Sequence, residues 1–372
     1  MADVDPQLKL FRRQYLQLFQ PDFLAWPHPQ LLRRADVQAW LYRHLFDGES
    51  RDARLPPERY QLRVMRPLVA KIEKAIQDPD EDEISDDLMN RIGALMTHGV
   101  PSEFDALKER AYVTFTCLAE VTSTSQRQED GGIDEEPTIT LLERRNLISG
   151  SRTTGHRTWE AALHLGAYLL TDAGRRLVEG RSVLELGAGT GFLAILCAKH
   201  LGATHVTTTD GDENVVDALK ENLALNGLDA QGEGEGESGG GDGQKSVLAK
   251  RLWWGEELEG TWVEKDFDAH PYDVVIGADI TYDKVAIAAL VQTLGHLFKM
   301  RPGLQVIIAG VIRNLDTFQS FQDECDRMRF KVEEISYPVK QMREQTTLFY
   351  AAAVPIKILS ITSPSHPSST AP

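Results

Sequence analysis

A run of acidic and glycine residues at alternate positions is the part of this chain whose spacing points most clearly to ligand chemistry. The segment V-L-E-L-G-A-G-T-G carries Glu185, Gly187, Gly189 and Gly191. Glycine is needed where a backbone turns through positive φ or approaches a ligand closely. The fingerprint of dinucleotide-binding folds has its third glycine at the position that Phe192 occupies here. The spacing therefore disfavours binding of NAD or FAD. On the loop alone, a glycine-rich turn in some other α/β protein stays open.

A carboxylate one predicted strand later has the position and chemistry to bind a ribose. Residues 205–209 form a short strand that ends in Asp210, about 20 residues past the glycines, as in doubly wound folds. A carboxylate can accept both hydroxyl hydrogens of a vicinal diol in charge-assisted bonds. Asp212 is a rival for this role, and a solvated turn is the alternative without a ligand. We favour Asp210 because it directly ends the apolar run.

Three more features precede the sheet or follow its predicted strands. Trp159 precedes the sheet, Trp254 follows the strand at 246–252, and the segment G-A-D-I-T-Y follows the strand at 273–277. Ligands of open α/β sheets bind at the carboxyl ends of strands, and a tryptophan there offers a flat apolar wall. Core packing is the alternative for either tryptophan. A helix cap is the alternative for Asp279 within the last segment.

The elements that would position these residues lie in the second half of the chain. Helical segments alternate with apolar runs that read as strands at 182–186, 205–209, 246–252, 273–277 and 305–309, and two last strands are expected at 331–336 and 347–354. This pattern predicts an α/β fold: a seven-stranded, Rossmann-like sheet with helices on both faces. A short hairpin from 138–142 and 146–148 is expected to precede it.

The remaining segments suggest domain boundaries. Apolar residues at helical spacing predict an all-α accessory domain over 1–121, and the polar stretch 122–137 reads as a linker. The second domain would span 138–359, interrupted by an insertion at 229–244, in which seven of sixteen residues are glycine. Such a composition buries too little apolar surface to order, so we expect a flexible loop. The tail 360–372 is rich in Ser, Pro and Thr and is expected to be disordered.

Composition narrows the class of protein. The 372 residues, 42% of them hydrophobic, suffice for two globular domains, and three scattered cysteines form neither a disulfide framework nor a metal site. We see no signal peptide and no apolar run of membrane-spanning length, so we expect the cytosol, with the nucleus as a second compartment, and no membrane partner. A net charge of −16 argues against nucleic acid and suits a basic partner, such as a lysine-bearing protein surface.

Four motifs together resemble a known family. T-W-E-A-A at 158–162, the glycine loop at 183–191, L-x-W-G at 252–255 and G-A-D-x-x-Y at 277–282 occur in the order seen in the family 16 seven-stranded protein-lysine methyltransferases. These are class I methyltransferases that use S-adenosyl-L-methionine. The resemblance covers roughly residues 138 to 355. A helical N-terminal domain makes the branch that methylates eukaryotic elongation factor 2 the most similar one.

The resemblance implies roles for individual residues. The target lysine would face Asp279 and Tyr282, and no metal is implied. The S-adenosylmethionine pocket would be lined by Trp159, Glu185, Gly187, Ala188, Gly189, Gly191, Asp210, Trp254 and Ala278. A lysine amine must be neutral to attack a methyl group, so we expect Asp279 to orient the amine and Tyr282 to shape its channel. A role for Asp279 as proton acceptor is not required.

Other functions on the same fold stay open at this point. Methyltransferases that act on base amines usually carry N/D-P-P-Y/F where this chain has D-I-T-Y, without proline. The enzyme could instead modify another protein, a nucleic acid or a small molecule. A catalytically silent cofactor-binding scaffold is the third reading, because a fold does not prove an activity. The intact glycine loop and Asp210 favour an enzyme.

Overall fold

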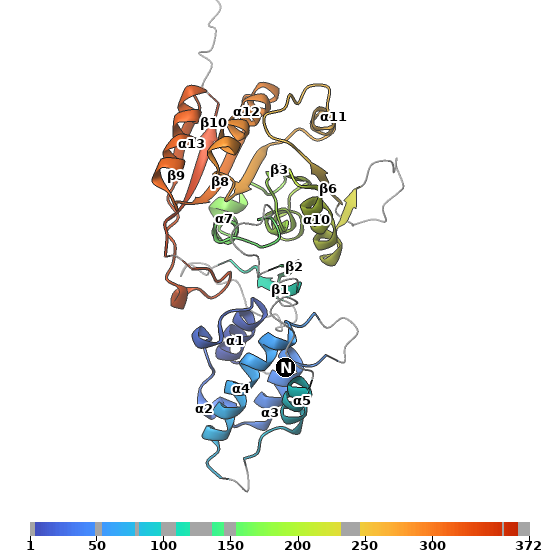
Figure 1. Ribbon diagram of the computed structural model, residues 1–372, viewed down its shortest axis with the longest axis vertical. Coiled ribbons are helices and arrows are strands. Elements are labelled where there is room, and N and C mark those ends of the chain that lie inside the picture. The colour runs from blue at the N-terminus through green and yellow to red at the C-terminus, as the bar shows by residue number, and fades with distance from the viewer. Residues whose placement is uncertain are drawn as a thin grey trace, which may run out of the picture. The chain divides into compact units, whose positions relative to one another are not determined.

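The computed structural model describes residues 4–48, 54–78, 82–97, 109–119, 136–144, 154–231, 246–351 and 353–363. The chain forms two compact units, residues 1–151 and 152–372, each with its own hydrophobic core (Figure 1). None of the described helices is long and apolar enough to cross a membrane.

The first unit is mainly helical. Its helices are α1 (Pro6–Leu16), α2 (Pro29–Leu32), α3 (Ala35–Leu45), α4 (Glu58–Ala75) and α5 (Asp86–Thr97), with the short 3₁₀ helix η1 (Pro21–Phe23) between α1 and α2. Apolar residues at helical spacing, such as Phe11, Tyr15 and Met65, face inward and are fully buried. The apolar stripes seen in the sequence therefore form one core.

A two-stranded antiparallel sheet makes the unit less purely helical than predicted. Strand β1 (Ala111–Thr116) pairs with β2 (Thr138–Glu143), so the expectation of helix throughout 1–121 is wrong at β1. The alternating β-branched and aromatic residues of A-Y-V-T-F-T suit a strand. Its partner is the segment expected to open the second domain. The other predicted hairpin strand, 146–148, lies outside the described residues.

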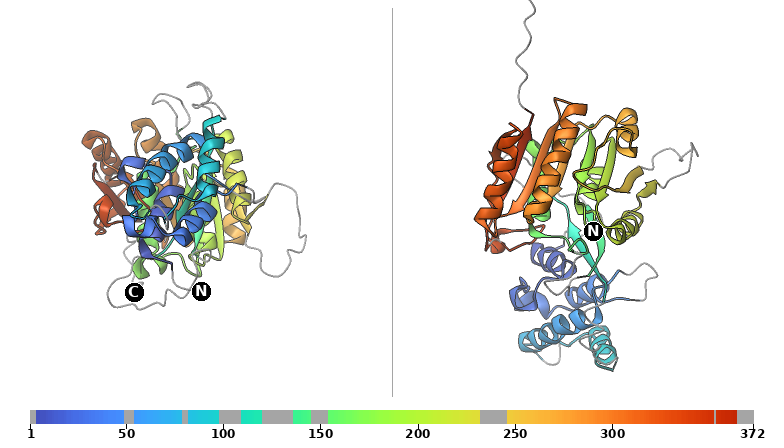
Figure 2. Two further views of the ribbon diagram at one scale, coloured as in Figure 1. Left: turned by 90° about the horizontal axis from the view of Figure 1, so that it is seen from below. Right: turned by 45° about the horizontal axis from the view of Figure 1, so that its top comes forward.

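The second unit contains the predicted α/β sheet, which is confirmed. Its strand order is β5-β6-β4-β3-β7-β8-β10-β9, with β5 to β8 parallel and β10 antiparallel to both its neighbours (Figure 2). The strands are β3 (Ser182–Leu186), β4 (His205–Asp210), β5 (Asp229–Gln231), β6 (Ser246–Arg251), β7 (Val274–Ala278), β8 (Gln305–Val311), β9 (Lys331–Ile335) and β10 (Ile356–Thr362). Six of them match predicted strands, β10 lies beyond the predicted last strand at 347–354, and β5 adds an edge strand.

Helices pack against this sheet. They are α7 (Glu160–Leu169), α8 (Asp172–Arg175), α9 (Phe192–Lys199), α10 (Glu213–Leu225), α11 (Trp262–Ala269), α12 (Lys284–Met300) and α13 (Leu315–Arg327), and η3 (Met342–Glu344) is a short 3₁₀ helix. Helices α12 and α13 share one hydrophobic core with β7 and β8. Strands β3 and β7 lie at the centre of the sheet, and their side chains are nearly all buried, as expected for parallel strands covered on both faces.

Two predictions at the end of the sheet need correction. The described residues of 347–354 form no strand. The Gln345 side chain bonds to both backbone groups of Tyr350: its Oε1 accepts from Tyr350 N at 2.9 Å and its Nε2 donates to Tyr350 O at 3.1 Å. The last strand is β10 instead, which runs three residues past the predicted domain end at 359.

The start of the predicted flexible insertion is a strand instead. Its first three residues form β5, which pairs with β6 in parallel. The glycine-rich remainder lies outside the described residues.

A buried carboxyl group ties α9, the helix after the glycine loop, to the sheet. Glu185 on β3 is 2% exposed, and its Oε2 accepts hydrogen bonds from Thr208 Oγ1 on β4 at 2.9 Å and from Ala194 N on α9 at 3.2 Å. Burial raises the pKa of Glu185 from its ordinary value of 4.5 to about 8. At neutral pH the folded protein therefore holds this side chain mainly in its protonated form.

The raised pKa of Glu185 predicts a pH-dependent stability. Between pH 4.5 and 8 the unfolded chain loses this proton and the folded protein keeps it, so the free energy of unfolding falls as pH rises, by at most about 1.4 kcal/mol per pH unit. Glu185→Gln is neutral throughout. We expect the stability of this variant, relative to the wild type, to rise steadily with pH across that window in urea unfolding. For the exposed Glu259→Gln, the plot of unfolding free energy against pH should run parallel to that of the wild type. A parallel plot for Glu185→Gln would contradict the proposal that Glu185 is protonated in the folded protein.

Candidate active site

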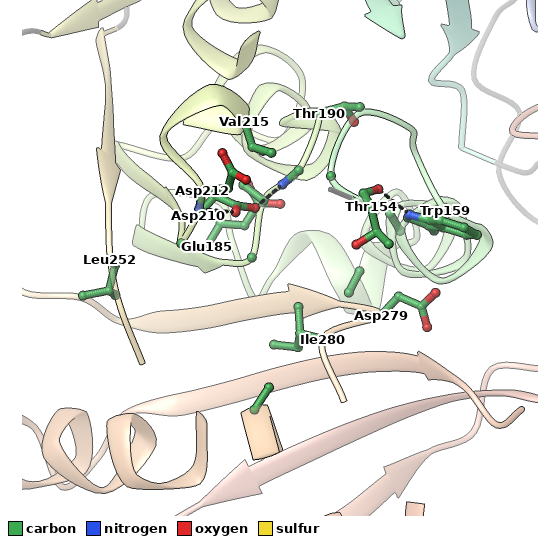
Figure 3. Close-up of a pocket in the computed structure, with 18 of the residues that line it drawn as sticks. Thr154, Trp159, Glu185, Thr190, Asp210, Asp212, Val215, Leu252, Asp279 and Ile280 are labelled. Carbon is green, nitrogen blue, oxygen red and sulfur yellow. Dashed lines mark hydrogen bonds between the residues drawn. The ribbon is translucent and has the colours of Figure 1, made fainter. Parts of the chain in front are cut away.

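A cavity of about 780 Å³ opens at the carboxyl ends of the central strands of the second unit (Figure 3). Its walls come from the segment before α7, the glycine loop after β3, and the residues that follow β4, β6 and β7. The structure brings together nearly all residues predicted for the site: Trp159, Glu185, Gly187, Ala188, Gly189, Asp210, Trp254, Ala278, Asp279 and Tyr282. Only Gly191 is not part of the wall.

The glycine loop is a backbone conformation that side chains would obstruct. Gly187, Gly189 and Gly191 have φ angles of 65°, 55° and 82°, in the left-handed region that favours glycine. A Cβ on Gly187 would lie 2.6 Å from a methyl carbon of Ile280, and one on Gly189 would lie 3.1 Å from the carbonyl oxygen of Gly155. These positions therefore stay bare beside the cavity.

Gly191 has a steric reason of its own to be a glycine. It precedes the first residue of α9, and a Cβ there would lie 2.2 Å from Leu219 Cδ1 on α10. Its lack of a side chain leaves room for the side chain of Leu219. A ligand contact at Gly191 stays a prediction.

Asp210 is held at the edge of the cavity by the glycine loop. Its Oδ2 accepts from Gly189 N at 3.1 Å and its Oδ1 accepts from Asp212 N at 3.1 Å. Burial raises the pKa of Asp210, and these backbone hydrogen bonds oppose the rise. Each oxygen keeps a lone pair for a further donor. Asp212, the rival, also lines the cavity, but its Oδ1 caps α10 by accepting from Asn214 N at 2.8 Å.

The two tryptophans are partly exposed, and they contact different neighbours. Trp254 packs against the hydrophobic core and also lines the cavity. Core packing and a place in the cavity wall are therefore compatible for this residue. Trp159 donates from its Nε1 to Thr154 O at 3.0 Å, and the guanidinium carbons of Arg157 and Arg313 lie 5.3 and 5.4 Å from its ring centroid. Cation–π contacts of this kind hold an aromatic ring in place.

Asp279 is the most constrained polar residue of the site. Its φ of 57° is unusual for a residue other than glycine, and its side chain is 9% exposed. Its backbone N donates to Ala309 O at 2.8 Å, and its Oδ1 accepts from Val311 N at 3.3 Å. The cap of α12 is Asp283, which accepts from Val285 N at 2.7 Å, so Asp279 is not a helix cap. The end of β8 therefore holds Asp279 in one orientation.

Arg313 is a site residue that the sequence analysis missed. Its Nη1 donates to Asp279 Oδ2 at 2.9 Å, and its Nη2 lies 3.8 Å from Glu160 Oε2. It lies two residues past the carboxyl end of β8. The rule that ligand groups gather at the carboxyl ends of parallel strands could have identified it.

The mouth of the cavity carries exposed apolar side chains. Tyr282 is 61% exposed and Val285 is 83% exposed, and both line the cavity. Within the described residues, no group of three or more His, Cys, Asp or Glu side chains could hold a metal ion. In Figure 3 the carboxylates of Glu185, Asp210 and Asp212 lie together, apart from Trp159 and Asp279. The cavity thus separates a polar end suited to a ribose from an acidic group paired with an arginine.

Known proteins with the same sequence pattern share an activity. A family model described as lysine methyltransferase matches residues 142–323. The protein-lysine N-methyltransferase EFM3 of Chaetomium thermophilum is 44% identical over 361 residues, which cover 97% of this chain and 99% of that protein. EFM3 of Saccharomyces cerevisiae is 33% identical over 62% of this chain and 67% of its own length.

A human relative extends the comparison. The human protein-lysine N-methyltransferase EEF2KMT is 27% identical over 74% of this chain and 77% of its own length. The similarity to the Chaetomium protein includes both units, so it is not confined to the glycine loop that many cofactor-binding folds share. The chain therefore belongs to the family of S-adenosylmethionine-dependent protein-lysine methyltransferases.

Proposed function

We propose that this enzyme methylates a lysine of translation elongation factor 2. The observation that carries the proposal is the similarity to human EEF2KMT, which covers 74% of this chain. The similarity to EFM3 covers 97% of this chain and so includes the helical first unit. The described residues that line the cavity all belong to the second unit, and a domain that lacks a catalytic pattern of its own is suited to recognising a protein. The similarity to EEF2KMT supports the same substrate.

The cavity fits S-adenosylmethionine in size and in chemistry. A volume of about 780 Å³ is within the range of small-molecule sites. The left-handed turns at Gly187 and Gly189 leave bare backbone where a ligand can approach. We assign the ribose hydroxyls to Asp210, whose two oxygens are held by backbone N–H groups. Apolar wall residues such as Leu252, Val215 and Trp254 suit the flat adenine.

The chain's own task is to position a neutral amine and exclude water. S-adenosylmethionine, when bound, supplies an electrophilic methyl group. At its ordinary pKa roughly one lysine side chain in 2,500 is neutral at pH 7, so the site must favour the neutral form. Burial in a channel and a nearby positive charge both lower the pKa of an amine. The exposed ring of Tyr282 at the mouth can cover the aliphatic part of a lysine side chain.

The pair of Asp279 and Arg313 suits this task better than a lone carboxylate would. A lone carboxylate would hold a lysine as the ammonium ion and raise its pKa. Because Arg313 already balances the charge of Asp279, the carboxylate can accept a hydrogen bond from the amine with less preference for the charged form. We assign amine orientation to Asp279, and we assign to Arg313 the positioning of Asp279 and the balance of its charge.

The ribose assignment predicts a cofactor-binding defect without loss of fold. Asp210→Ala removes charge-assisted hydrogen bonds of about 1.5–3 kcal/mol each, which should weaken S-adenosylhomocysteine binding at least about tenfold in calorimetry. Asp212→Ala is the matched variant: it should cost about 1 kcal/mol of stability as a lost helix cap and change the affinity little. If the affinities rank the other way, the ribose role belongs to Asp212.

The substrate assignment and the role of Asp279 are tested together. The purified enzyme should transfer labelled methyl to purified elongation factor 2. Asp279→Asn should lower the rate about 100-fold, the cost of a misplaced reacting group, with S-adenosylhomocysteine affinity changed less than tenfold. Asparagine tolerates the left-handed backbone at this position, so the fold should persist.

Tyr282→Phe keeps the ring and removes the hydroxyl, and it should lower the rate much less. Normal turnover by Asp279→Asn would rule out the orienting role. An unlabelled elongation factor 2, beside another labelled protein in a cell lysate, would leave the enzyme class intact and disprove the substrate.

Charge balance by Arg313 predicts a change in the pH profile. Arg313→Gln leaves the Asp279 carboxylate without its cation, which should raise the pKa of the bound substrate lysine. We expect the rise of kcat with pH to move upward by about one pH unit or more, so that activity recovers at alkaline pH. Arg313→Lys keeps the charge and should keep the wild-type midpoint. An equal loss of rate at every pH in Arg313→Gln would show that Arg313 only supports the local structure.

A further inference from the structure

A basic groove on the helical first unit is a second concave surface of this enzyme. It has a volume of about 850 Å³, lies between η1 and one face of α4, and has Trp26, Leu62 and Pro67 in its wall. Its cations are Arg59, Arg63, Arg66 and Lys71. We call this surface the α4 groove. The catalytic cavity contains none of its residues.

The repeat of the α-helix places the three arginines on one side of α4. Arg59, Arg63 and Arg66 follow at intervals of four and three residues, which stack on one face of a helix. Lys71 comes five residues after Arg66 and therefore lies on a neighbouring side of the helix that also lines the groove. Residues 59–71 span roughly 18 Å at 1.5 Å per residue. The opposite face of α4 is committed to the core, where Val64 and other apolar residues are fully buried.

The three arginines are available for a partner. They are exposed, and in the part of the chain that the structure describes none of them is in an ion pair. Lys71 differs, since its Nζ lies 5.2 Å from the ring centroid of Trp26 and so stays beside the apolar floor. One acidic residue, Asp22, lines the groove against four cations. This excess of positive charge stands out in a chain with a net charge of −16.

The groove also has the apolar and aromatic character of a protein-binding surface. Trp26 is partly exposed in its wall, and Phe23, beside Asp22 on η1, is 63% exposed. Exposed aromatic residues and arginines are the types most enriched where protein interfaces concentrate their binding energy. The groove therefore offers apolar contact along its floor and charge along its rim.

We propose that the α4 groove binds an acidic segment of the protein substrate, away from the methylated lysine. A length of roughly 18 Å accommodates about five residues of extended chain. Carboxylates along such a segment would pair with the arginines, and an apolar side chain between them would meet Trp26 and Leu62. A nucleic acid fits less well: domains that bind one are usually strongly basic, whereas this chain has a sequence pI of 5.1. The proposal rests on the proposed function only for the identity of the substrate.

The direct test uses the full chain and an acidic probe. We would titrate a fluorescein-labelled hexapeptide of Glu and Asp with one central Phe and follow fluorescence anisotropy. Arg63→Glu with Arg66→Glu should weaken binding at least about tenfold, and added salt should weaken wild-type binding.

The matched control is Arg43→Glu with Lys74→Glu, an equal charge change at exposed positions of the same unit outside the groove wall. It should bind like the wild type. Arg63→Ala with Arg66→Ala serves if the reversed charges disturb folding.

A kinetic test connects the groove to the enzyme reaction. With elongation factor 2 as substrate, the groove variants should raise KM about tenfold or more and leave kcat and S-adenosylhomocysteine affinity unchanged, because the lost contact lies outside the catalytic cavity. Failure of the wild-type enzyme on elongation factor 2 would refute that substrate, whereas the anisotropy titration would still decide the groove.

Three results would overturn the proposal. The first is equal loss of peptide binding in the groove and control variants, and the second is tighter binding of a single-stranded RNA than of the acidic peptide. A fall in kcat without a rise in KM is the third.

Discussion

The site depends on how closely the glycine loop approaches its neighbours. Between β3 and α9 the backbone turns three times through the left-handed region, and side chains at these positions would meet Ile280, Gly155 or Leu219. The loop is therefore in contact with the segment before α7, the end of β7 and α10 at once. Asp210 accepts from Gly189 N and fastens the second strand end to the same loop. One backbone constraint thus aligns the polar end of the cavity.

Three acidic side chains in this cavity have different tasks because their surroundings differ. Glu185 is enclosed, has a pKa of about 8, and ties two strands to α9. Asp210 is partly buried, with both oxygens held by backbone N–H groups and lone pairs left for a ligand. Asp279 is paired with Arg313. Residue type alone does not distinguish them, whereas burial and partners do.

The sequence was most informative where structure is local. The strand–glycine loop–helix unit, the strand that ends in Asp210 and the motif at 277–282 needed only neighbouring residues to be interpreted, and they were placed correctly. The error at β1 involves a distant partner, because β1 pairs with residues more than twenty positions away. The error at 347–354 is local: the side chain of Gln345, five residues before Tyr350, bonds to the backbone of that residue. Arg313 belongs to the site only because β8 lies beside β7. Such contacts are set by tertiary packing, which overrides local propensity.

The negative net charge of the whole chain and the positive charge of the α4 groove are compatible at physiological salt. A net charge of −16 favours a lysine-bearing surface in general, but charges farther apart than about 8 Å are largely screened at that ionic strength. A partner within contact distance of the groove therefore meets mainly Arg59, Arg63 and Arg66, whatever the sum over the chain. At the catalytic cavity, the proposed substrate would meet Asp283 and the exposed ring of Tyr282. Under both proposals, a substrate that carries an acidic segment and an accessible lysine would satisfy each surface, and discrimination against proteins with only one of them would follow from the need for both.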